Sequence, residues 1–397
     1  MPNQFISTIA GDIETYFIND YAVIDEFAAT GSLWIAGKNN YGQLGRSDIT
    51  HRSSPIQTVS GGTNWKLVVG GGYHTAAIKT DGTLWLWGAA GNGILGNGSL
   101  AATHQSSPVQ TVSAGNNWKL VGSGHYHNAA IKTDGTLWTW GRNNNGTLGN
   151  NLGAALASPV QTVAGGTNWK LVAVGRYHNA AIKTNGTLWL WGQNTNGALG
   201  DNSVANKSSP VQAVGAGTNW KSAAGGRFHT AAIKTDGTLW AWGLNGNGQI
   251  GDNGVTPKSS PVQTIAGGTN WKLVACGFYH TAAIKTDGTL WTWGLNGNGQ
   301  IGDNGVTPKS SPVQTIAGGT NWKSVAGGGY NTAAVKTDGT LWIWGRNING
   351  QLGDNTVVHR SSPVQTVAGG TNWKLVTNGS YHAGAIHFYD ADNLYPK

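Results

Sequence analysis

Histidine is the residue in this sequence best suited to metal binding or proton transfer, and it recurs at one position of a regular pattern. Six histidines and one asparagine occupy that position at intervals of 51 or 53 residues: His74, His127, His178, His229, His280, Asn331 and His382. Neutral imidazole binds metal ions and titrates near neutral pH. However, such even spacing puts the rings on separate structural units, and an asparagine amide hydrogen-bonds but binds metals poorly. The pattern therefore predicts a structural, hydrogen-bonding role, with no bound metal and no cofactor.

The residues just before each repeated position are aromatic or variable, which indicates binding. A tyrosine precedes the position in six units, and Phe228 precedes it in the other. The residue one place earlier differs between units: Gly72, His125, Arg176, Arg227, Phe278, Gly329 and Ser380. Rigid scaffolds carry binding residues on loops of this kind. We predict binding contacts from seven residues: His125, Tyr126, Arg176, Tyr177, Arg227, Phe278 and Tyr279.

The sequence contains none of the common catalytic motifs. It has no Gly-x-Ser-x-Gly elbow, no phosphate-binding loop and no His-Glu-x-x-His motif. Glu14 and Glu26 are the only glutamates, and most aspartates sit in recurring turn sequences. A glycoside hydrolase needs two facing carboxylates in one cleft, which turn residues on separate units do not supply. We therefore predict that the protein is not an enzyme.

Each repeated unit contains four short segments with strand character. In the unit that follows Asn219 they cover residues 220–224, 229–234, 238–242 and 261–265. Runs of roughly four to eight β-branched and aromatic residues between turn sequences are typical of strands. Asp-Gly, or Asn-Gly in one unit, separates the second and third segments and predicts a two-residue type I′ hairpin turn. No apolar spacing of three and four residues persists long enough to predict a helix.

An Asn-Trp-Lys triplet marks every unit. Its tryptophans are Trp65, Trp118, Trp169, Trp220, Trp271, Trp322 and Trp373. A fixed period of this length indicates a repeat architecture in which no unit buries its apolar faces alone. Four antiparallel strands repeated seven times predict an all-β fold, a seven-bladed β-propeller. An open β-solenoid is the alternative.

The two ends of the chain favour the closed ring. The first matches to the repeat are a third strand at 31–37 and a fourth strand at 55–59. The last matches are a first strand at 373–376 and a second strand at 381–387. The N-terminal and C-terminal strands therefore complete one shared blade, which removes two exposed strand edges.

The repeat also sets the predicted domain boundaries. We assign residues 21–389 to the propeller, residues 1–20 to an N-terminal extension and residues 390–397 to a C-terminal tail. The extension is either an anchor to a larger assembly or a strand packed against the closing blade. Residues 1–20 show no signal-peptide pattern, and no apolar run approaches the ~18 residues that a membrane span needs. We therefore predict no membrane insertion.

Composition constrains the core and the partners. We expect most of the 20 tryptophans to lie in the core and Cys276 to be a small buried thiol. The formal net charge is +8, but thirteen lysines occupy repeat positions, seven after Asn-Trp and six before the Asp/Asn-Gly turn. Repetition spreads these charges around the ring, so the pattern disfavours nucleic acid as a partner.

The Gly-x-Tyr-His and Asp-Gly-Thr-Leu-Trp-x-Trp-Gly elements resemble those of the regulator of chromosome condensation repeat family. The resemblance covers about residues 21–389 and implies a seven-bladed propeller. The family includes a nuclear exchange factor for a small GTPase, together with bacterial, viral and scaffold proteins. The exchange factor uses acidic and polar groups at the corner before the histidine, and none of the seven residues there is acidic in this chain. The resemblance therefore does not extend to exchange activity.

The leading functional hypothesis from sequence is a non-catalytic display scaffold, on a virion (phage) or a cell surface, that binds through the propeller-face loops. Residues 235–272 and 286–323 differ at one position, Ala241 against Thr292, and near-identical blades suit a repetitive target. The composition, rich in Asn, Thr, Ser and Gly, favours a virion or extracellular surface over the cytoplasm. The alternatives are a lectin-like glycan-binding protein, and an intracellular protein-interaction scaffold or small-GTPase regulator. The expected partner is a protein or a glycan, with assembly into a larger complex also open.

Overall fold

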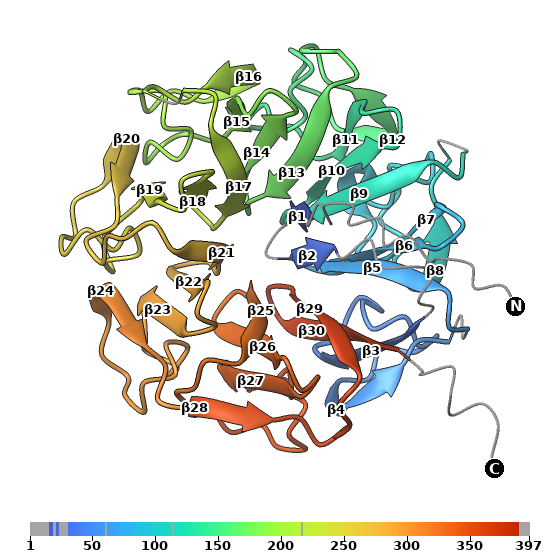
Figure 1. Ribbon diagram of the computed structural model, residues 1–397. Helices are drawn as coiled ribbons and strands as arrows, with labels where there is room; N and C mark the ends of the chain where they lie inside the picture. The colour runs from blue at the N-terminus through green and yellow to red at the C-terminus, as the bar shows by residue number, and fades with distance from the viewer. Residues whose placement is uncertain are drawn as a thin grey trace, which may run out of the picture.

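The computed structural model describes residues 16–18, 21–23, 31–59, 62–112, 115–215 and 217–388. It contains seven four-stranded antiparallel blades arranged as a ring around a central channel (Figure 1). Two of the blades are joined into one sheet by a bridge between Gly31 and Trp65. The predicted all-β, seven-bladed propeller is therefore confirmed.

Each blade uses its strands in the same order from the channel outward (Figure 1). The first, innermost strands are β5 (Trp65–Gly70), β9 (Trp118–Ser123), β13 (Trp169–Val174), β17 (Trp220–Gly225), β21 (Trp271–Cys276), β25 (Trp322–Gly327) and β29 (Trp373–Asn378). The second strands are β6 (His74–Lys79), β10 (His127–Lys132), β14 (His178–Lys183), β18 (His229–Lys234), β22 (His280–Lys285), β26 (Asn331–Lys336) and β30 (His382–Phe388). The third strands are β3 (Gly31–Gly37), β7 (Leu84–Gly88), β11 (Leu137–Gly141), β15 (Leu188–Gly192), β19 (Leu239–Gly243), β23 (Leu290–Gly294) and β27 (Leu341–Gly345). The fourth, outermost strands are β4 (Arg52–Gln57), β8 (Gln105–Gln110), β12 (Leu156–Gln161), β16 (Lys207–Gln212), β20 (Lys258–Gln263), β24 (Lys309–Gln314) and β28 (Arg360–Gln365).

The ring closes through a blade shared by the two ends of the chain, as predicted. Strand β3 pairs antiparallel with β30 over seven residues, from Gly31 opposite Phe388 to Gly37 opposite His382. Strand β29 pairs with the other edge of β30, and β4 pairs with β3. The closing blade therefore has the same strand order as the other six, and neither β3 nor β30 is left as an unpaired edge.

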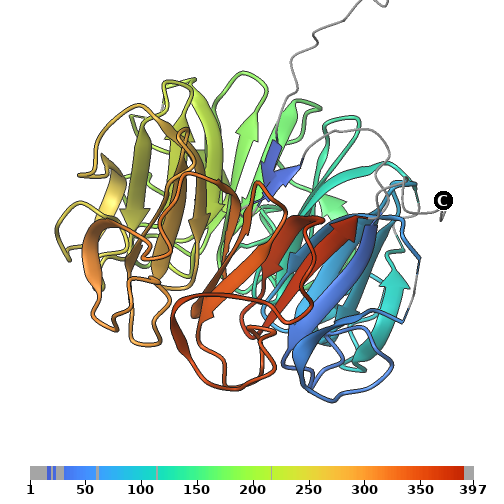
Figure 2. The same cartoon turned by 60° about the horizontal axis from the view of Figure 1, so that its bottom comes forward.

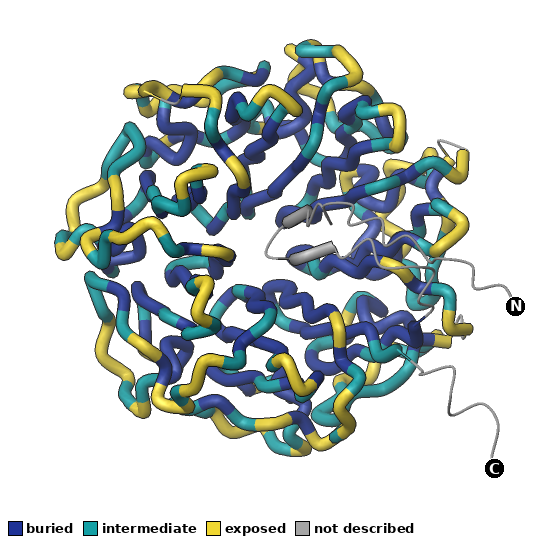
Figure 3. Tube along the Cα trace, in the orientation of Figure 1, coloured by how far each residue is buried: buried dark blue, intermediate teal, exposed yellow. Residues whose placement is uncertain are grey.

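Small residues and tryptophans build the interfaces between blades. The second strands are buried along almost their whole length, and their central alanines let neighbouring sheets approach closely. Thirteen of the 20 tryptophans are buried and the remaining seven are half-buried. Trp242, for example, donates its indole N–H to the carbonyl of Ala198 in the preceding blade, 2.8 Å away. The prediction that most tryptophans belong to the core is confirmed, and Cys276 is buried as predicted. Figure 3 shows the buried strands inside a periphery of exposed loops.

The lysine that ends most second strands also has a structural role. Lys234 Nζ lies 5.0 Å from the ring centre of Trp220 and 4.4 Å from that of Trp240. The same arrangement recurs in six blades, and in the closing blade His387 packs against Trp373 instead, with ring centres 4.9 Å apart. A cation over an aromatic face is attracted by the ring quadrupole, so these lysines brace the blades.

The turn between the second and third strands differs from the prediction. Gly237 has a φ of +80°, but Asp236 does not have a positive φ, which a type I′ turn requires. Lys234 donates its N–H to the Thr238 carbonyl, and Gly237 donates to the Lys234 carbonyl, both at 3.0 Å. The loop is therefore three residues long, a type I turn followed by a left-handed glycine, and the type I′ prediction is wrong. Asp236 Oδ1 accepts from the Thr238 N–H at 2.9 Å and so stabilises this turn.

The fourth strand begins three residues and ends two residues earlier than the sequence pattern indicates. Strand β20 begins at Lys258, which pairs with Gly243, whereas the apolar run predicted a strand over 261–265. Residue Ile265 lies beyond the strand and is exposed. The prediction was wrong because β20 is an outer edge strand with little apolar character, where proline is tolerated. Its register is set by pairing with β19 and not by its own propensity.

A separate hairpin lies outside the blades. Within the described ranges, strands β1 (Tyr16–Ile18) and β2 (Tyr21–Val23) pair with each other and with no strand of a blade. Their backbones lie against the innermost strands of several blades, at one end of the channel (Figure 2). The first strand that joins a blade is β3, so the boundary at residue 21 and the role of residues 1–20 stay predictions. Residues 390–397 lie outside the described part of the chain. No helix in the described ranges is long and apolar enough to cross a bilayer.

Candidate binding site at the channel mouth

The seven corners between first and second strands meet at one end of the channel. At this end the axis holds a cavity of about 60 Å³, which is lined largely by glycine, including Gly175, Gly226 and Gly277. Without Cβ atoms, seven blades can approach the axis closely. A Cβ on Gly226 would clash with the ring of His229. The residues two places before the repeated histidine therefore surround a narrow opening.

A closed belt of backbone hydrogen bonds joins these corners. In each blade the amide of the residue two places before the repeated histidine donates to a carbonyl of the next blade, at 2.9 to 3.3 Å. The donor and acceptor pairs are Gly72 and Gly124, His125 and Arg176, Arg176 and Gly226, Arg227 and Phe278, Phe278 and Gly328, Gly329 and Gly379, and Ser380 and Gly71. Because the belt uses only main-chain atoms, which must be paired when buried, it leaves the side chain at this position free to vary.

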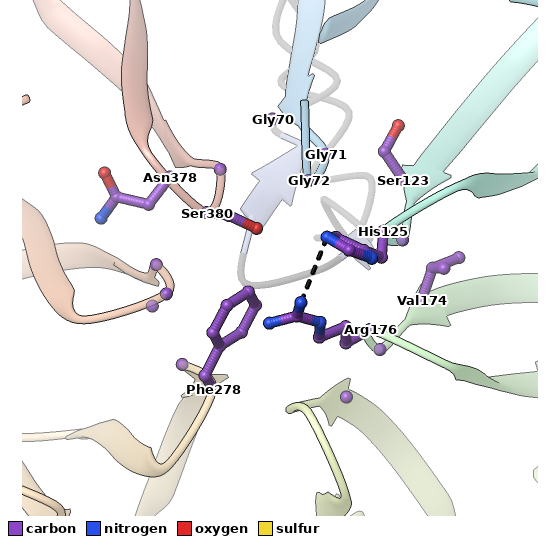
Figure 4. A pocket seen from close by; sticks show the side chains of 18 of the residues that line it. Gly70, Gly71, Gly72, Ser123, His125, Val174, Arg176, Phe278, Asn378 and Ser380 are labelled. Atoms are coloured by element: carbon purple, nitrogen blue, oxygen red, sulfur yellow. Dashed lines mark hydrogen bonds between the residues drawn. The ribbon is translucent and has the colours of Figure 1, made fainter. Parts of the chain in front are cut away.

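Three of the variable side chains meet across the opening (Figure 4). Arg176 Nη2 lies 3.2 Å from His125 Nε2, and the Arg176 guanidinium carbon lies 4.4 Å from the centre of the Phe278 ring. Arginine only donates hydrogen bonds, so His125 Nε2 accepts. Burial, together with the charge of Arg176, lowers the pKa of His125 to about 3. His125 is therefore neutral at neutral pH.

Arg227 occupies the equivalent corner of the next blade. Its guanidinium carbon lies 4.9 Å from the centre of the Phe228 ring and 5.2 Å from that of Tyr279. Its Nη1 donates to the Tyr279 hydroxyl. Arg176 and Arg227 are thus held side by side by aromatic rings, on two adjacent blades.

A ring of half-buried aromatic residues surrounds the opening. We call it the tyrosine ring, and it consists of Tyr73, Tyr126, Tyr177, Phe228, Tyr279, Tyr330 and Tyr381. Several neighbours are in contact: the ring centres of Tyr73 and Tyr381 are 5.4 Å apart, and those of Tyr177 and Phe228 are 5.5 Å apart. Burial raises the pKa of Tyr73, Tyr126 and Tyr279, so their hydroxyls stay protonated.

Three further cations were not identified from the sequence. Lys38 Nζ lies 5.0 Å from the ring centre of Tyr381, and the guanidinium carbons of Arg142 and Arg346 lie 5.6 Å and 5.3 Å from those of Tyr126 and Tyr330. All three follow the glycine that ends a third strand, and their amides donate to the carbonyl of the adjacent tyrosine. Their common position, directly after the glycine, was visible in the sequence. That these cations lie close to the tyrosines depends on how the third strand pairs with the second.

The sequence-predicted site residues fall into two groups in space. The seven binding candidates, His125, Tyr126, Arg176, Tyr177, Arg227, Phe278 and Tyr279, all lie at the channel mouth. The repeated histidines, His74, His127, His178, His229, His280 and His382, are all fully buried between blades. The binding role of the first group stays a prediction at this point.

Each repeated histidine hydrogen-bonds to the residue after the repeated position of the next blade. The Nε2 atoms lie 2.7 to 3.1 Å from Thr Oγ1 or Asn Oδ1 atoms. Thr230 Oγ1, for example, donates to the Ala198 carbonyl at 2.8 Å, so it accepts from His178 Nε2–H. Burial lowers the pKa of the six histidines to about 3 or 4. They are neutral links between blades.

The asparagine at position 331 matches a change in the neighbouring blade. In the closing blade the residue that would accept from position 331 is Ala383, which has no side-chain hydrogen-bonding group. Asn331 Nδ2 donates instead to Asn378 Oδ1, 3.3 Å away, and Asn378 Nδ2 donates to the Ala326 carbonyl. The same interface carries Ala36 where the other blades have a buried tryptophan. We call this interface, between the β25–β28 blade and the closing blade, the seam.

The mouth combines aromatic and cationic groups. The tyrosine ring supplies aromatic faces and hydroxyls, and the variable corners supply guanidinium groups. Near Arg142, Arg176 and Arg227 the surface is hollowed into a cavity of about 300 Å³. None of the residues that line this cavity is an aspartate, a glutamate, a serine or a cysteine, so it presents donors and aromatic surface without a nucleophile or a general base of those types.

Comparison with known proteins identifies related repeats along the chain. The RCC1-like domain matches residues 121–395, and the regulator of chromosome condensation (RCC1) repeat matches residues 30–78 and 81–131. The ultraviolet-B receptor UVR8 of Arabidopsis thaliana is 32% identical over 337 residues, which is 82% of this chain and 76% of that protein. The mitochondrial RCC1 domain-containing protein RUG3 of the same plant is 27% identical, over 83% of this chain and 81% of that protein.

A solved structure has the same fold. The crystal structure of Prp20p from Saccharomyces cerevisiae superposes with a TM-score of 0.81 at 21% identity, and covers 92% of this chain and 93% of that chain. At this level of identity the likeness concerns the fold, and it supports the seven-bladed ring.

Proposed function

This chain belongs to the regulator of chromosome condensation (RCC1) repeat family, and we propose that it is a non-catalytic scaffold that binds a partner protein through the tyrosine ring. The observation that carries the proposal is the ring itself. Seven half-buried aromatic residues surround one end of the channel, and the corners between them carry different side chains in different blades. Tyrosine and arginine are enriched at protein interfaces and dominate their binding energy.

The arrangement of rigid and variable parts also supports protein binding. The backbone belt and the buried histidine links hold the corners in place without using the variable side chains. A preorganised surface loses little conformational entropy when it binds. The ring can therefore present different contacts in each blade on one invariant frame.

The relatives favour a protein partner over the other hypotheses from sequence. Prp20p is described as binding Gsp1p and histones, and UVR8 is a receptor. None of these three relatives is described as a virion protein, an adhesin or a lectin, and RUG3 is mitochondrial. We therefore place the protein-interaction scaffold ahead of virion or cell-surface display and of glycan binding. Nucleotide exchange on a small GTPase is ranked lower, because no acidic residue occupies the seven corners.

Selection from a random-peptide display library tests this proposal. The bait is the full-length chain, and the selected peptides are then measured against a Tyr330→Ala, Tyr381→Ala double variant. These two residues lie on the side of the mouth away from the 300 Å³ cavity. A matched control is Ile265→Ala, Ile316→Ala, which removes two exposed aliphatic side chains of the outer rim.

We expect selected peptides to bind the wild-type and control rings alike and to bind the tyrosine variant at least about tenfold more weakly. Melting temperatures within a few degrees of wild type would show that the variants are folded. Peptides that bind all three proteins equally would contradict the proposal.

A further inference from the structure

Three arginines from three consecutive blades surround one cavity. Arg142 follows β11, Arg176 precedes β14 and Arg227 precedes β18. All three line the cavity of about 300 Å³, together with the aromatic rings of Tyr126, Tyr177 and Phe228. Side-chain amides complete the lining: Asn144, Asn145 and Gln193. The cavity therefore offers several N–H donors on an aromatic wall, and none of the described residues that line it is a carboxylate.

The loops around this cavity are also short of acidic groups. In five blades the loop after the third strand carries an aspartate paired with a lysine or arginine at the start of the fourth strand: Asp48 and Arg52, Asp201 and Lys207, Asp252 and Lys258, Asp303 and Lys309, and Asp354 and Arg360. In the loop that carries Arg142, the corresponding residues are Asn150 and Leu156. In the loop that carries Gln193, Asp201 is already paired with Lys207 at 3.2 Å. No acid in these two loops is available to neutralise the arginines.

The arginines are oriented but their donors are not used up. Each of Arg176 and Arg227 makes one side-chain hydrogen bond, to His125 and to Tyr279 respectively. The Nε atoms of both are buried and have no hydrogen-bond partner among the residues that the structure describes. An arginine has five N–H donors, and a buried donor left unpaired is destabilising. A bound oxyanion would accept from the remaining Nη donors, because guanidinium groups form paired, charge-assisted hydrogen bonds with carboxylates and phosphates.

We propose that this cavity binds the carboxylate or phosphate group of a peptide segment that belongs to the protein partner. The inference rests on the proposed function and specifies the chemistry of the partner. A cavity of this size accommodates a side chain and its immediate neighbours. A nucleic acid would need a longer basic track for its backbone, and six lysines of this chain are instead held over tryptophan rings.

Fluorescence anisotropy with labelled peptides tests the inference on the full-length chain. The probes are a glutamate-rich decapeptide, a phosphoserine-containing decapeptide and a matched neutral decapeptide rich in glutamine, with inorganic phosphate as competitor. A single-stranded oligonucleotide is the fourth probe. The test variant is Arg176→Gln, Arg227→Gln. The charge-matched control is Lys221→Gln, Lys272→Gln. These two lysines are exposed and lie near the end of an innermost strand that is farther from the channel mouth.

We expect at least one anionic peptide to bind more tightly than the neutral one, and to bind the arginine variant at least about tenfold more weakly while the lysine control stays within about twofold. The anionic peptide that binds more tightly shows whether the cavity prefers a carboxylate or a phosphate group. Arg142→Gln removes a cation that lines the same cavity but lies on none of the seven corners. It is expected to weaken binding in the same direction and guards against misfolding of the double variant.

Equal losses in the arginine and lysine variants would overturn the inference, because they would indicate general electrostatics. Tighter binding of the oligonucleotide than of either anionic peptide would also overturn it. If display selection yields neutral peptides that need the tyrosine ring, while both anionic probes fail to bind, the proposed function stands and this inference falls.

Discussion

The guanidinium of Arg176 lies 4.4 Å from the centre of the Phe278 ring, although the two residues come from blades that are not neighbours. The blade that carries Arg227 lies between these two blades in the ring. It also fixes Arg176 against His125, so that one charged side chain contacts groups from two other blades. The channel mouth is therefore an assembled surface and not seven copies of one local site.

Removing the Arg176 charge should raise the pKa of His125. In Arg176→Gln the pKa should rise above its value of about 3 but stay below the ordinary 6.5, because burial is the larger cause of the shift and persists. Titration of the histidine ring protons by NMR measures this. Arg142→Gln is the matched control and should give a smaller rise, because Arg142 contributes less to the shift. An unchanged His125 pKa in Arg176→Gln would refute the assigned contact.

The buried histidines should make the fold sensitive to mild acid. Their folded pKa is about 3 or 4 and their unfolded pKa is 6.5, so only the unfolded chain takes up protons between these values. Their contribution to the free energy of unfolding should therefore be constant above pH 6.5. Below it, stability should fall by up to about 1.4 kcal/mol per pH unit for each of the six.

Urea unfolding between pH 7.5 and 4.5 measures this effect, since the aspartates titrate mainly at lower pH. The variant His229→Asn introduces the residue that the chain already carries at Asn331. It removes one of the six groups and should flatten the dependence by up to about 1.4 kcal/mol per pH unit. A free energy of unfolding that does not change between pH 6.5 and 4.5 would contradict the lowered pKa of the buried histidines.

The seam should be the blade interface that is easiest to improve. The double variant Asn331→His, Ala383→Thr restores the histidine-to-threonine bond found at other interfaces and should stabilise the protein by about 1 kcal/mol. Asn331→His alone should destabilise, because its imidazole would face Ala383 without an acceptor. A double-mutant cycle from urea midpoints gives the coupling energy. A coupling of zero would contradict the proposed link.

Ring closure should depend on strand β30. A chain that ends at Asn378 lacks β30 and leaves β3 without its partner, so it should lose the cooperative unfolding transition of the full-length protein. A synthetic peptide of residues 379–388 should restore the transition by strand addition. Identical melting curves for the truncated and full-length chains would show that the ring does not need the shared blade.

The repeat predicted most of the fold because its signal lies within each unit. Tryptophan, histidine and Asp-Gly recur at fixed distances along the chain. The strand order, the number of blades and the shared blade could therefore be predicted from the sequence alone. Where the prediction failed, at the Asp236 turn and at strand β20, the outcome depended on backbone conformation and on pairing with β19. Residue type at these positions does not specify either one.

The sequence by itself determined the ring, the burial of its tryptophans and the position of the variable corners. Only the tertiary structure decided which side chains meet. Closing the ring brings residues 51 or more positions apart to hydrogen-bonding distance, as with His178 and Thr230, and lets Arg176 reach Phe278 across the opening. It also brings Arg142 beside the corner arginines. These contacts depend on the curvature of the assembled blades, which no single unit encodes.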